Sequence, residues 1–361
     1  VQRFKEKYLR RAFKNLPNEP HGLVKFIKEN AWVERYAQFL VLKKLNKNKS
    51  WNKWRITEIP DDKKEEVAFH IWCQFLAVKG WNKLLKYANK KGIEIIADCP
   101  FYVDYNSADC YFNKEQFVLD QNYHPLIVSG CPPDDFSKKG QLWGTPVYNF
   151  EKMEANGFSF LINRLLFLAK RCNLLRLDHF RAFDTYYVIP AGDKKASRGQ
   201  WLKGPGKMFF DRLYENNPTI KLIAEDLGFL FESVHELRDA YQLPGMRVMQ
   251  FSIFEEALND EHVVLYPGTH DNLTLYGWLK SLDKQRLNEL KKKLGYPEDL
   301  YGALFNFIWN SKSLITIFPL QDLLRLDNRA RINSPGTVGK PNWCFKLRDM
   351  AWQEKIKYGN R

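Results

Sequence analysis

The stretch LLRLDHF at residues 174–180 shows the pattern from which the fold class follows, because a short leucine-rich run of strand length ends on Asp178. Five other runs after residue 92 have the same form, and longer helical patterns separate them. The six runs are IEIIADCP (93–100), LLRLDHF (174–180), KLIAEDLG (221–228), MRVMQF (246–251), HVVLYPGTHD (262–271) and LITIFPLQD (314–322). Alternating strands and helices predict an α/β fold, and polar residues at strand ends are typical of a (β/α)8 TIM barrel.

The rest of the chain sets the expected domain organisation. Residues 1–92 carry apolar residues at helical spacings and predict a helical subdomain, with residues 93–361 forming the catalytic barrel domain. Six strands are two short of a closed barrel, and residues 1–92 offer no convincing pair to complete it. Residues 104–157, between the first two predicted strands, are rich in Pro, Gly and aromatic residues, so we expect a long active-site loop there.

Composition excludes several classes of protein. The 361 residues are 45% hydrophobic and 27% charged, which suits a large folded core, and the sequence contains no apolar run of membrane-spanning length. The six cysteines form no CxxC pair and no Cys/His cluster, so we expect reduced thiols in a cytoplasmic protein and no metal site. The net charge of +14 raises nucleic acid as a partner, but residues 1–50 alone carry 13 basic and 4 acidic residues. A solvated, lysine-rich helical surface is therefore the favoured interpretation.

Four carboxylates stand at the ends of predicted strands: Asp98, Asp178, Glu225 and Asp271. In a barrel these ends face one cleft, so the four acids are expected to converge. Binding of Mg²⁺ or Ca²⁺ is one use for such a group. Cleavage of a glycosidic bond is another, since it needs one carboxylate as nucleophile and one carboxylic acid as proton donor.

The neighbours of two of these acids favour sugar chemistry. Arg176 lies two residues before Asp178 on the same strand face, and a nearby arginine lowers the pKa of a carboxyl group, as a nucleophile requires. Glu225 follows the apolar KLI, so burial is expected to raise its pKa toward that of a proton donor. His179 lies next to Asp178, and His270 and Asp271 supply a donor and an acceptor suited to adjacent sugar hydroxyls.

Each motif also has a structural explanation when taken alone. RLDH fits a buried Arg–Asp pair, AED fits a helix N-cap and THDN fits an Asx-turn. Their order and their common placement at strand ends favour a catalytic role. Among the aromatic residues, which could stack on sugar rings, Tyr102 and Trp143 are expected beside the cleft, whereas a core position is favoured for Trp343.

With these motifs in place, the chain resembles the 4-α-glucanotransferases (amylomaltases, disproportionating enzymes) of glycoside hydrolase family 77. The matching stretches are ADCPFYVDYNSAD (97–109), PPDDFSKKGQLWGTPVY (132–148), LLRLDHFRAF (174–183), LIAEDLG (222–228), GMRVMQF (245–251), YPGTHDNLT (266–274) and LQDLLRLDNRARINSPGTVGKPNW (320–343). The resemblance implies Asp178 as nucleophile, Glu225 as general acid/base and Asp271 as transition-state stabiliser. It implies substrate-binding roles for Asp98, Tyr102, Trp143, Arg176, His179 and His270, with Trp143 on a loop that covers the glucan.

The same resemblance implies an α-1,4-glucan donor, a glucose or maltooligosaccharide acceptor, no cofactor, and neither a nucleic acid nor a membrane partner. The family's first two barrel strands have no counterpart here, so we expect the chain to hold barrel strands 3 to 8 and Val1 to be a truncation point. Two alternatives remain open: an α-glucan hydrolase of the amylase type, and an inactive glucan-binding fragment. The oligomeric state does not follow from the sequence.

Overall fold

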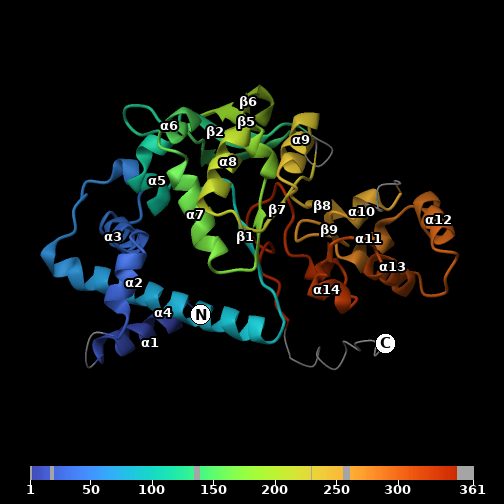
Figure 1. The fold of residues 1–361 in the computed structure, drawn as a ribbon, viewed down its shortest axis with the longest axis horizontal. Coiled ribbons are helices and arrows are strands. Elements are labelled where there is room, and N and C mark those ends of the chain that lie inside the picture. The colour runs from blue at the N-terminus through green and yellow to red at the C-terminus, as the bar shows by residue number, and fades with distance from the viewer. Residues whose placement is uncertain (1, 17–19, 134–138, 229, 255–260, 348–361) are drawn as a thin grey trace. The chain divides into compact units, whose positions relative to one another are not determined.

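A computed structural model describes the chain except for residues 1, 17–19, 134–138, 229, 255–260 and 348–361 (Figure 1). The chain divides into two compact units, each with its own core. Unit 1 comprises Val1–Pro132, Leu142–Asp178 and Ala182–Lys221. Unit 2 comprises Pro133–Gln141, His179–Arg181 and Leu222–Arg361.

The first part of unit 1 is helical, as the apolar spacing predicts. Its main helices are α1 (Gln2–Lys14), α2 (Leu23–Glu29), α3 (Trp32–Leu45) and α4 (Lys64–Lys90). Apolar residues from these helices meet in one cluster, in which Val33 and Ala37 of α3 and Trp72 of α4 are buried. The helical region therefore has a hydrophobic core of its own.

All six predicted strands are present in the structure. They are β1 (Ile96–Cys99), β4 (Leu174–Leu177), β7 (Leu222–Ala224), β8 (Gly245–Val248), β9 (Val263–Tyr266) and β10 (Ile315–Thr316). In unit 1, β1 and β4 pair in parallel with Asp98 opposite Arg176. In unit 2, β8, β9 and β10 form a parallel sheet in the order β10-β9-β8. The mixed α/β architecture is thus confirmed.

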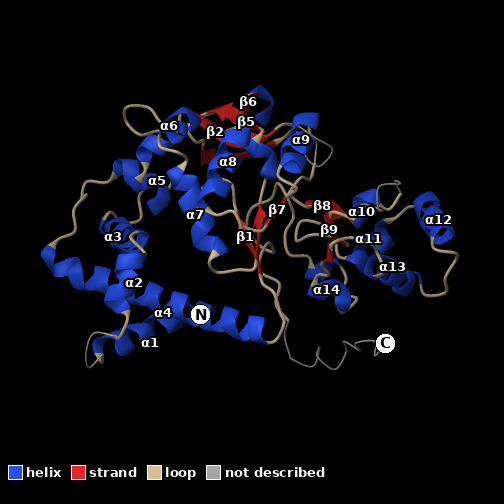
Figure 2. Ribbon diagram, in the orientation of Figure 1, coloured by secondary structure: helices blue, strands red, loops and turns tan. Residues whose placement is uncertain are grey.

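The expectation of a long loop over residues 104–157 is wrong in part. The segment contains α5 (Ala108–Phe112), β2 (Ile127–Cys131), β3 (Gln141–Pro146) and α6 (Phe150–Ala155). These two strands belong to a second sheet of the region around unit 1, separate from the β1–β4 pair, with the order β3-β2-β5-β6. It also contains two strands that the sequence analysis missed, β5 (Thr185–Pro190) and β6 (Gln200–Lys203). Figure 2 shows β2, β5 and β6 gathered apart from β1.

The second sheet escaped prediction because its stability depends on antiparallel partners distant in sequence. The β2 strand pairs with β5 across about 60 residues, with Ser129 opposite Val188. The β3 strand includes Gly144 and Pro146, which weaken any local strand pattern. Residues 134–138 of the expected active-site loop lie outside the described residues.

The remaining helices connect the strands in both units. Unit 1 contains α7 (Ser159–Ala169) and α8 (Gly206–Asn216), and unit 2 contains α9 (Glu232–Ala240), α10 (Met249–Ser252), α11 (Leu275–Ser281), α12 (Lys284–Lys293), α13 (Leu300–Trp309) and α14 (Leu320–Leu323). Residues from α10, β9, α11, α12 and α13 form the main apolar cluster described for unit 2. This core supports the segment between β9 and α11, which carries the predicted THDN motif.

A buried carboxylate caps α11 inside this core. The Asp322 Oδ1 atom accepts a hydrogen bond of 2.8 Å from the Leu275 backbone N–H, and the residue is only 2% exposed. Burial raises the pKa of Asp322 from its ordinary value of 3.8 to about 6. Ionisation of Asp322 above that pH therefore lowers the stability of the folded state relative to an unburied carboxyl group.

We expect Asp322→Asn to stabilise the protein at alkaline pH. Because the folded-state pKa exceeds the unfolded one, Asp322 contributes most stability below about pH 4, and that contribution falls as the pH rises through 6. Two pKa units correspond to roughly 3 kcal/mol, so the variant should melt a few degrees higher at pH 8 and show no advantage near pH 4. Thermal melts at both pH values measure this.

Asp283→Asn is the matched control, since Asp283 caps α12 through the Arg286 N–H but is exposed. An equal gain for the control at pH 8, or a gain for Asp322→Asn that does not depend on pH, would contradict the explanation.

Candidate active site

Strand alternation brings three of the predicted site residues together in unit 1. Leu175 and Leu177 are buried on one face of β4, so Arg176 points from the other face, together with Asp178 two residues later. The Arg176 guanidinium donates to Asp98 Oδ1 from Nε at 2.8 Å and to Asp178 Oδ1 from Nη2 at 2.9 Å. One arginine therefore bridges two carboxylates.

The two predicted aromatic residues also meet in unit 1. The Tyr102 and Trp143 ring centroids lie 6.3 Å apart, and Trp143 is 40% exposed. Tyr102 stacks on the buried Tyr148 at 6.0 Å with an interplanar angle of 23°. Tyr102 thus follows β1 closely, while Trp143 comes from β3, a strand rather than the loop expected from the sequence.

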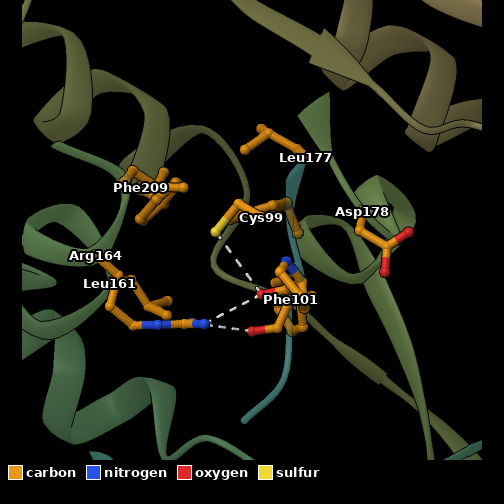
Figure 3. Close-up of a pocket in the computed structure, with 10 residues that line it drawn as sticks. Cys99, Phe101, Leu161, Arg164, Leu177, Asp178 and Phe209 are labelled. Carbon is orange, nitrogen blue, oxygen red and sulfur yellow. Dashed lines mark hydrogen bonds between the residues drawn. The ribbon is translucent and has the colours of Figure 1, made fainter. Parts of the chain in front are cut away.

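A small pocket lies directly behind Asp178 (Figure 3). It is lined by Cys99, Pro100, Phe101, Leu161, Arg164, Leu165, Leu177, Asp178, Phe183 and Phe209. Arg164 donates to the backbone oxygens of Pro100 and Phe101, each at 3.3 Å. In Figure 3 the Asp178 carboxylate is directed away from Arg164. The pocket is mostly apolar and is part of the support of the site.

Tyr148 completes this support. Its hydroxyl donates to the Phe101 oxygen at 2.6 Å and accepts from Arg164 Nη1 at 3.1 Å, and its side chain is 1% exposed. The segment after β1, which carries Tyr102, is therefore tied to the end of β3 and to α7. Burial raises the pKa of Tyr148 well above its ordinary value, so the hydroxyl stays protonated.

In unit 2, Glu225 is held at the end of β7 by backbone donors. Its Oε2 accepts from the His179 N–H at 2.8 Å and its Oε1 from the Leu227 N–H at 3.3 Å. The Glu225 backbone oxygen also accepts from the Phe180 N–H at 3.1 Å. Both carboxylate oxygens are oriented by main-chain groups, which leaves little freedom of rotation.

The His179 imidazole is neutral at ordinary pH. Burial and the nearby positive charge of Arg181 lower its pKa from 6.5 to about 3. Its backbone has φ = 55°, in the left-handed region that few side chains adopt. In this conformation the His179 N–H points toward Glu225 and holds its carboxylate. His179 therefore contributes to the site through its backbone, whereas the sequence analysis expected a contribution from its side chain.

The THDN motif forms a turn and presents Asp271. The Thr269 N–H and hydroxyl both donate to Asn272 Oδ1 at 2.8 Å, which closes the turn. Asp271 Oδ1 accepts from Asn333 Nδ2 at 2.6 Å and lies 3.5 Å from His270 Nε2. The turn is closed by Asn272 accepting from a residue three positions earlier, so it is not an Asx-turn, but it is the same segment that presents Asp271.

The expected core position of Trp343 is wrong. Trp343 is 67% exposed, and its ring centroid lies 5.1 Å from that of His270. The Trp343 N–H donates to the Ile332 oxygen at 2.8 Å, so the backbone of the two segments is joined there. Trp343 lies in a Pro- and Gly-rich segment, which is typical of a surface loop, so the sequence did contain a signal for its exposure.

Two residues that the sequence analysis did not single out also support Asp271. Arg331 donates from Nη2 to the Asp271 backbone oxygen at 2.6 Å, and its Nε donates to the Asn333 oxygen at 2.8 Å. Asn333 binds the carboxylate itself. Both belong to the ARIN stretch, which has neither strand nor helix periodicity, so no local pattern marks them.

The described ranges contain no group of three or more His, Cys, Asp and Glu residues arranged to hold a metal ion. They also contain no helix that is long and apolar enough to cross a membrane. Within each unit, the candidate site carboxylates accept hydrogen bonds from arginine or asparagine side chains or from backbone N–H groups.

Comparison with known proteins gives consistent matches. The profile of the 4-alpha-glucanotransferase family, glycoside hydrolase family 77, matches residues 1–351. The 4-alpha-glucanotransferase of Aquifex aeolicus is 37% identical over 377 residues, covering 98% of this chain and 77% of that protein. The chloroplastic/amyloplastic enzyme of Solanum tuberosum is 36% identical over 337 residues, covering 88% and 58%. An amylomaltase from Streptococcus agalactiae in complex with acarbose has a TM-score of 0.93 at 30% identity, covering 98% and 76%.

We expect Tyr148→Phe to destabilise unit 1. The substitution removes one donor and one acceptor, so the Phe101 oxygen and Arg164 lose a buried partner at a cost of about 1–3 kcal/mol. Urea unfolding monitored by circular dichroism measures the change. Tyr105→Phe is the control, because the Tyr105 hydroxyl donates to the Tyr123 oxygen at an exposed position. Equal losses in the two variants would contradict the role assigned to burial.

Proposed function

This chain belongs to the 4-alpha-glucanotransferase family, enzymes that transfer segments of α-1,4-glucans, and we propose that Asp178, Glu225 and Asp271 are its catalytic residues. The observation that carries the proposal is the family match over residues 1–351, which includes all three of these carboxylates. Arg176 supports the role of Asp178, because the arginine favours an ionised nucleophile.

In the first step, the Asp178 carboxylate attacks the anomeric carbon of the donor glucan while the bond to the leaving oxygen breaks. Glu225 donates its proton to that oxygen, and the reducing-end fragment departs. The non-reducing segment remains joined to Asp178 through a β-linked ester. Asp271 holds sugar hydroxyls and stabilises the positive charge that develops on the ring.

In the second step, the Glu225 carboxylate takes a proton from the 4-hydroxyl of the acceptor, glucose or a maltooligosaccharide. The acceptor oxygen then attacks the anomeric carbon and displaces Asp178, which restores the α-configuration. Transfer in place of hydrolysis requires that water be excluded during the lifetime of the ester. We assign that task to the 132–148 segment, with Trp143 stacking on the glucan.

The other predicted residues have positioning and binding roles in this proposal. Asp98 and Arg176 form the charged network around the nucleophile, while Tyr102 offers an aromatic face for the glucan. The His179 backbone N–H donates to the Glu225 carboxylate, and the His270 imidazole lies beside the Asp271 carboxylate. No cofactor takes part in either step.

We also propose that the six parallel strands belong to a (β/α)8 barrel, as its strands 3 to 8, with residues 1–92 as a helical subdomain. The match to the Streptococcus agalactiae amylomaltase supports this arrangement. A role in starch or glycogen metabolism follows from the family. A cytoplasmic location is supported by six free cysteines, although the Solanum tuberosum relative is chloroplastic/amyloplastic.

Incubation with maltotriose tests the function. We expect free glucose together with maltooligosaccharides longer than the substrate, because the acceptor is another sugar. Chromatography of the products against time separates the three candidate functions. Shortening without elongation would identify a hydrolase, and no conversion by the folded protein would identify a glucan-binding protein.

We expect Asp178→Asn to lower the rate by at least about 10³-fold, since the amide cannot form the glycosyl ester. Asp62→Asn is the control, because that carboxylate is exposed and paired only with Lys63 among the contacts described. Far-ultraviolet circular dichroism checks that both variants are folded. A rate within tenfold of the parent for Asp178→Asn would overturn the assignment.

We expect Asn333→Ala to lower kcat by roughly 10- to 100-fold. The substitution removes the 2.6 Å donor to Asp271 Oδ1, and a hydrogen bond to a charged group contributes about 1.5–3 kcal/mol. Steady-state kinetics with maltotriose measure it. Asn342→Ala, which removes contacts to Ser334 and Thr337 but none to Asp271, should retain more activity. The reverse order would refute the role of Asn333.

A further inference from the structure

Directly after Glu225 in the chain lies a carboxylate with a different environment. The side chain of Asp226 is completely buried, and its Oδ2 accepts from Arg238 Nη1 at 2.6 Å. Its Oδ1 accepts from the Met246 N–H at 2.6 Å, and Arg247 Nη1 lies 3.7 Å from Oδ2. A buried charge with this many partners is costly to form and is well fixed once formed.

These contacts join three elements of unit 2. Within β7, the Ala224 N–H donates to the Pro244 oxygen at 2.9 Å. Two residues later the Asp226 side chain accepts from the Met246 N–H, so it continues the β7–β8 connection beyond the end of the strand. Arg238 adds α9.

The space for this carboxylate depends on a glycine. A Cβ atom on Gly245 would lie 2.6 Å from Asp226 Oδ2 and 2.9 Å from Oδ1, closer than real contacts allow. Any side chain at position 245 would therefore displace the Asp226 carboxylate or the start of β8. The glycine and the buried aspartate form one fitted arrangement.

Glu225 and Asp226 share a peptide bond, so the anchoring of one side chain restricts the other. Asp226 fixes the segment on its buried side, while the His179 and Leu227 N–H groups hold the Glu225 carboxylate. We propose that Asp226, paired with Arg238, is a positioning residue that holds Glu225 in the orientation needed for proton transfer. The inference rests on the proposed role of Glu225.

Charge balance gives the proposal a second consequence. In unit 2, His179 donates its N–H to Glu225 and lies near Arg181 from the same segment before β5. Arg238 of α9 and Arg247 of β8 lie around Asp226, and Asp239 of α9 pairs with Arg238. Asp226 and Arg238 offset one another. Asp226→Asn leaves a positive excess that favours the carboxylate of Glu225, whereas Arg238→Gln leaves a negative excess that favours its acid form.

The first test compares donors with different needs for an acid. Cleavage of maltotriose requires a proton donor for the leaving oxygen, whereas fluoride leaves from an α-maltosyl fluoride without one. We expect Asp226→Asn to lower kcat on maltotriose by about 10- to 100-fold, with KM changed by less than about threefold, and to lower the first-turnover rate of fluoride release, which reports formation of the glycosyl ester alone, much less. Similar losses on the two donors would overturn the proposal.

The second test uses the pH profile of kcat/KM on maltotriose. We expect its basic limb to move to lower pH in Asp226→Asn and to higher pH in Arg238→Gln, with Glu232→Gln, an exposed change on α9, leaving it in place. Shifts in the same direction, or none, would overturn the proposal. If the Arg238 variant fails to fold, Gly245→Ala takes its place, with the expectation of a lower kcat on maltotriose and a preserved rate with the fluoride.

Glu225→Gln distinguishes failure of this inference from failure of the proposed function. If Glu225 is the acid, its glutamine variant shows the same selective loss on maltotriose. A fluoride donor that rescues Glu225→Gln but not Asp226→Asn refutes the positioning role alone. A donor that rescues neither refutes the assignment of Glu225, and with it the inference.

Discussion

The contact on which unit 1 depends is the bridge from Arg176 to Asp98 and Asp178. It arises from the parallel register of β1 and β4, which sets Asp98 opposite Arg176, and from the two-residue period of a strand, which puts Asp178 on the same face. A shift of one residue in that register would turn Arg176 away from Asp98. The buried leucines of β4 prevent such a shift, so apolar packing on one face fixes the electrostatics of the other.

Much of the fold was predictable because parallel strands leave a local signature. Each of the six strands is a short apolar run with a polar end, and this pattern requires no knowledge of the partner strand. The sheet of β2, β3, β5 and β6 could not be found in this way. Its strands are paired antiparallel across long separations, and the residues of β3 also favour turns.

The residues of the candidate site also fall into two groups, those that a local pattern predicts and those that only the folded chain brings together. Arg176 and Asp178 were predictable from strand alternation, and Asp271 from a motif whose turn geometry is local. Asn333 and Arg331 reach Asp271 across about 60 residues of sequence, and Trp343 joins His270 across about 70. Only the folded chain brings such residues together, and irregular segments carry no periodic signal that would indicate it.

Gly245 shows how a position without a side chain can constrain a neighbouring carboxylate. Because Gly245 has no Cβ atom, there is space for the Asp226 carboxylate beside the start of β8. Asp226 is in turn joined by a peptide bond to Glu225. If Asp226 positions Glu225 as proposed, a saturation mutagenesis survey scored by activity would group position 245 with the candidate carboxylates, although glycine supplies no functional group. Engineering of this enzyme for other acceptors would do well to treat β8 as part of the fixed frame and to vary the irregular segments around it.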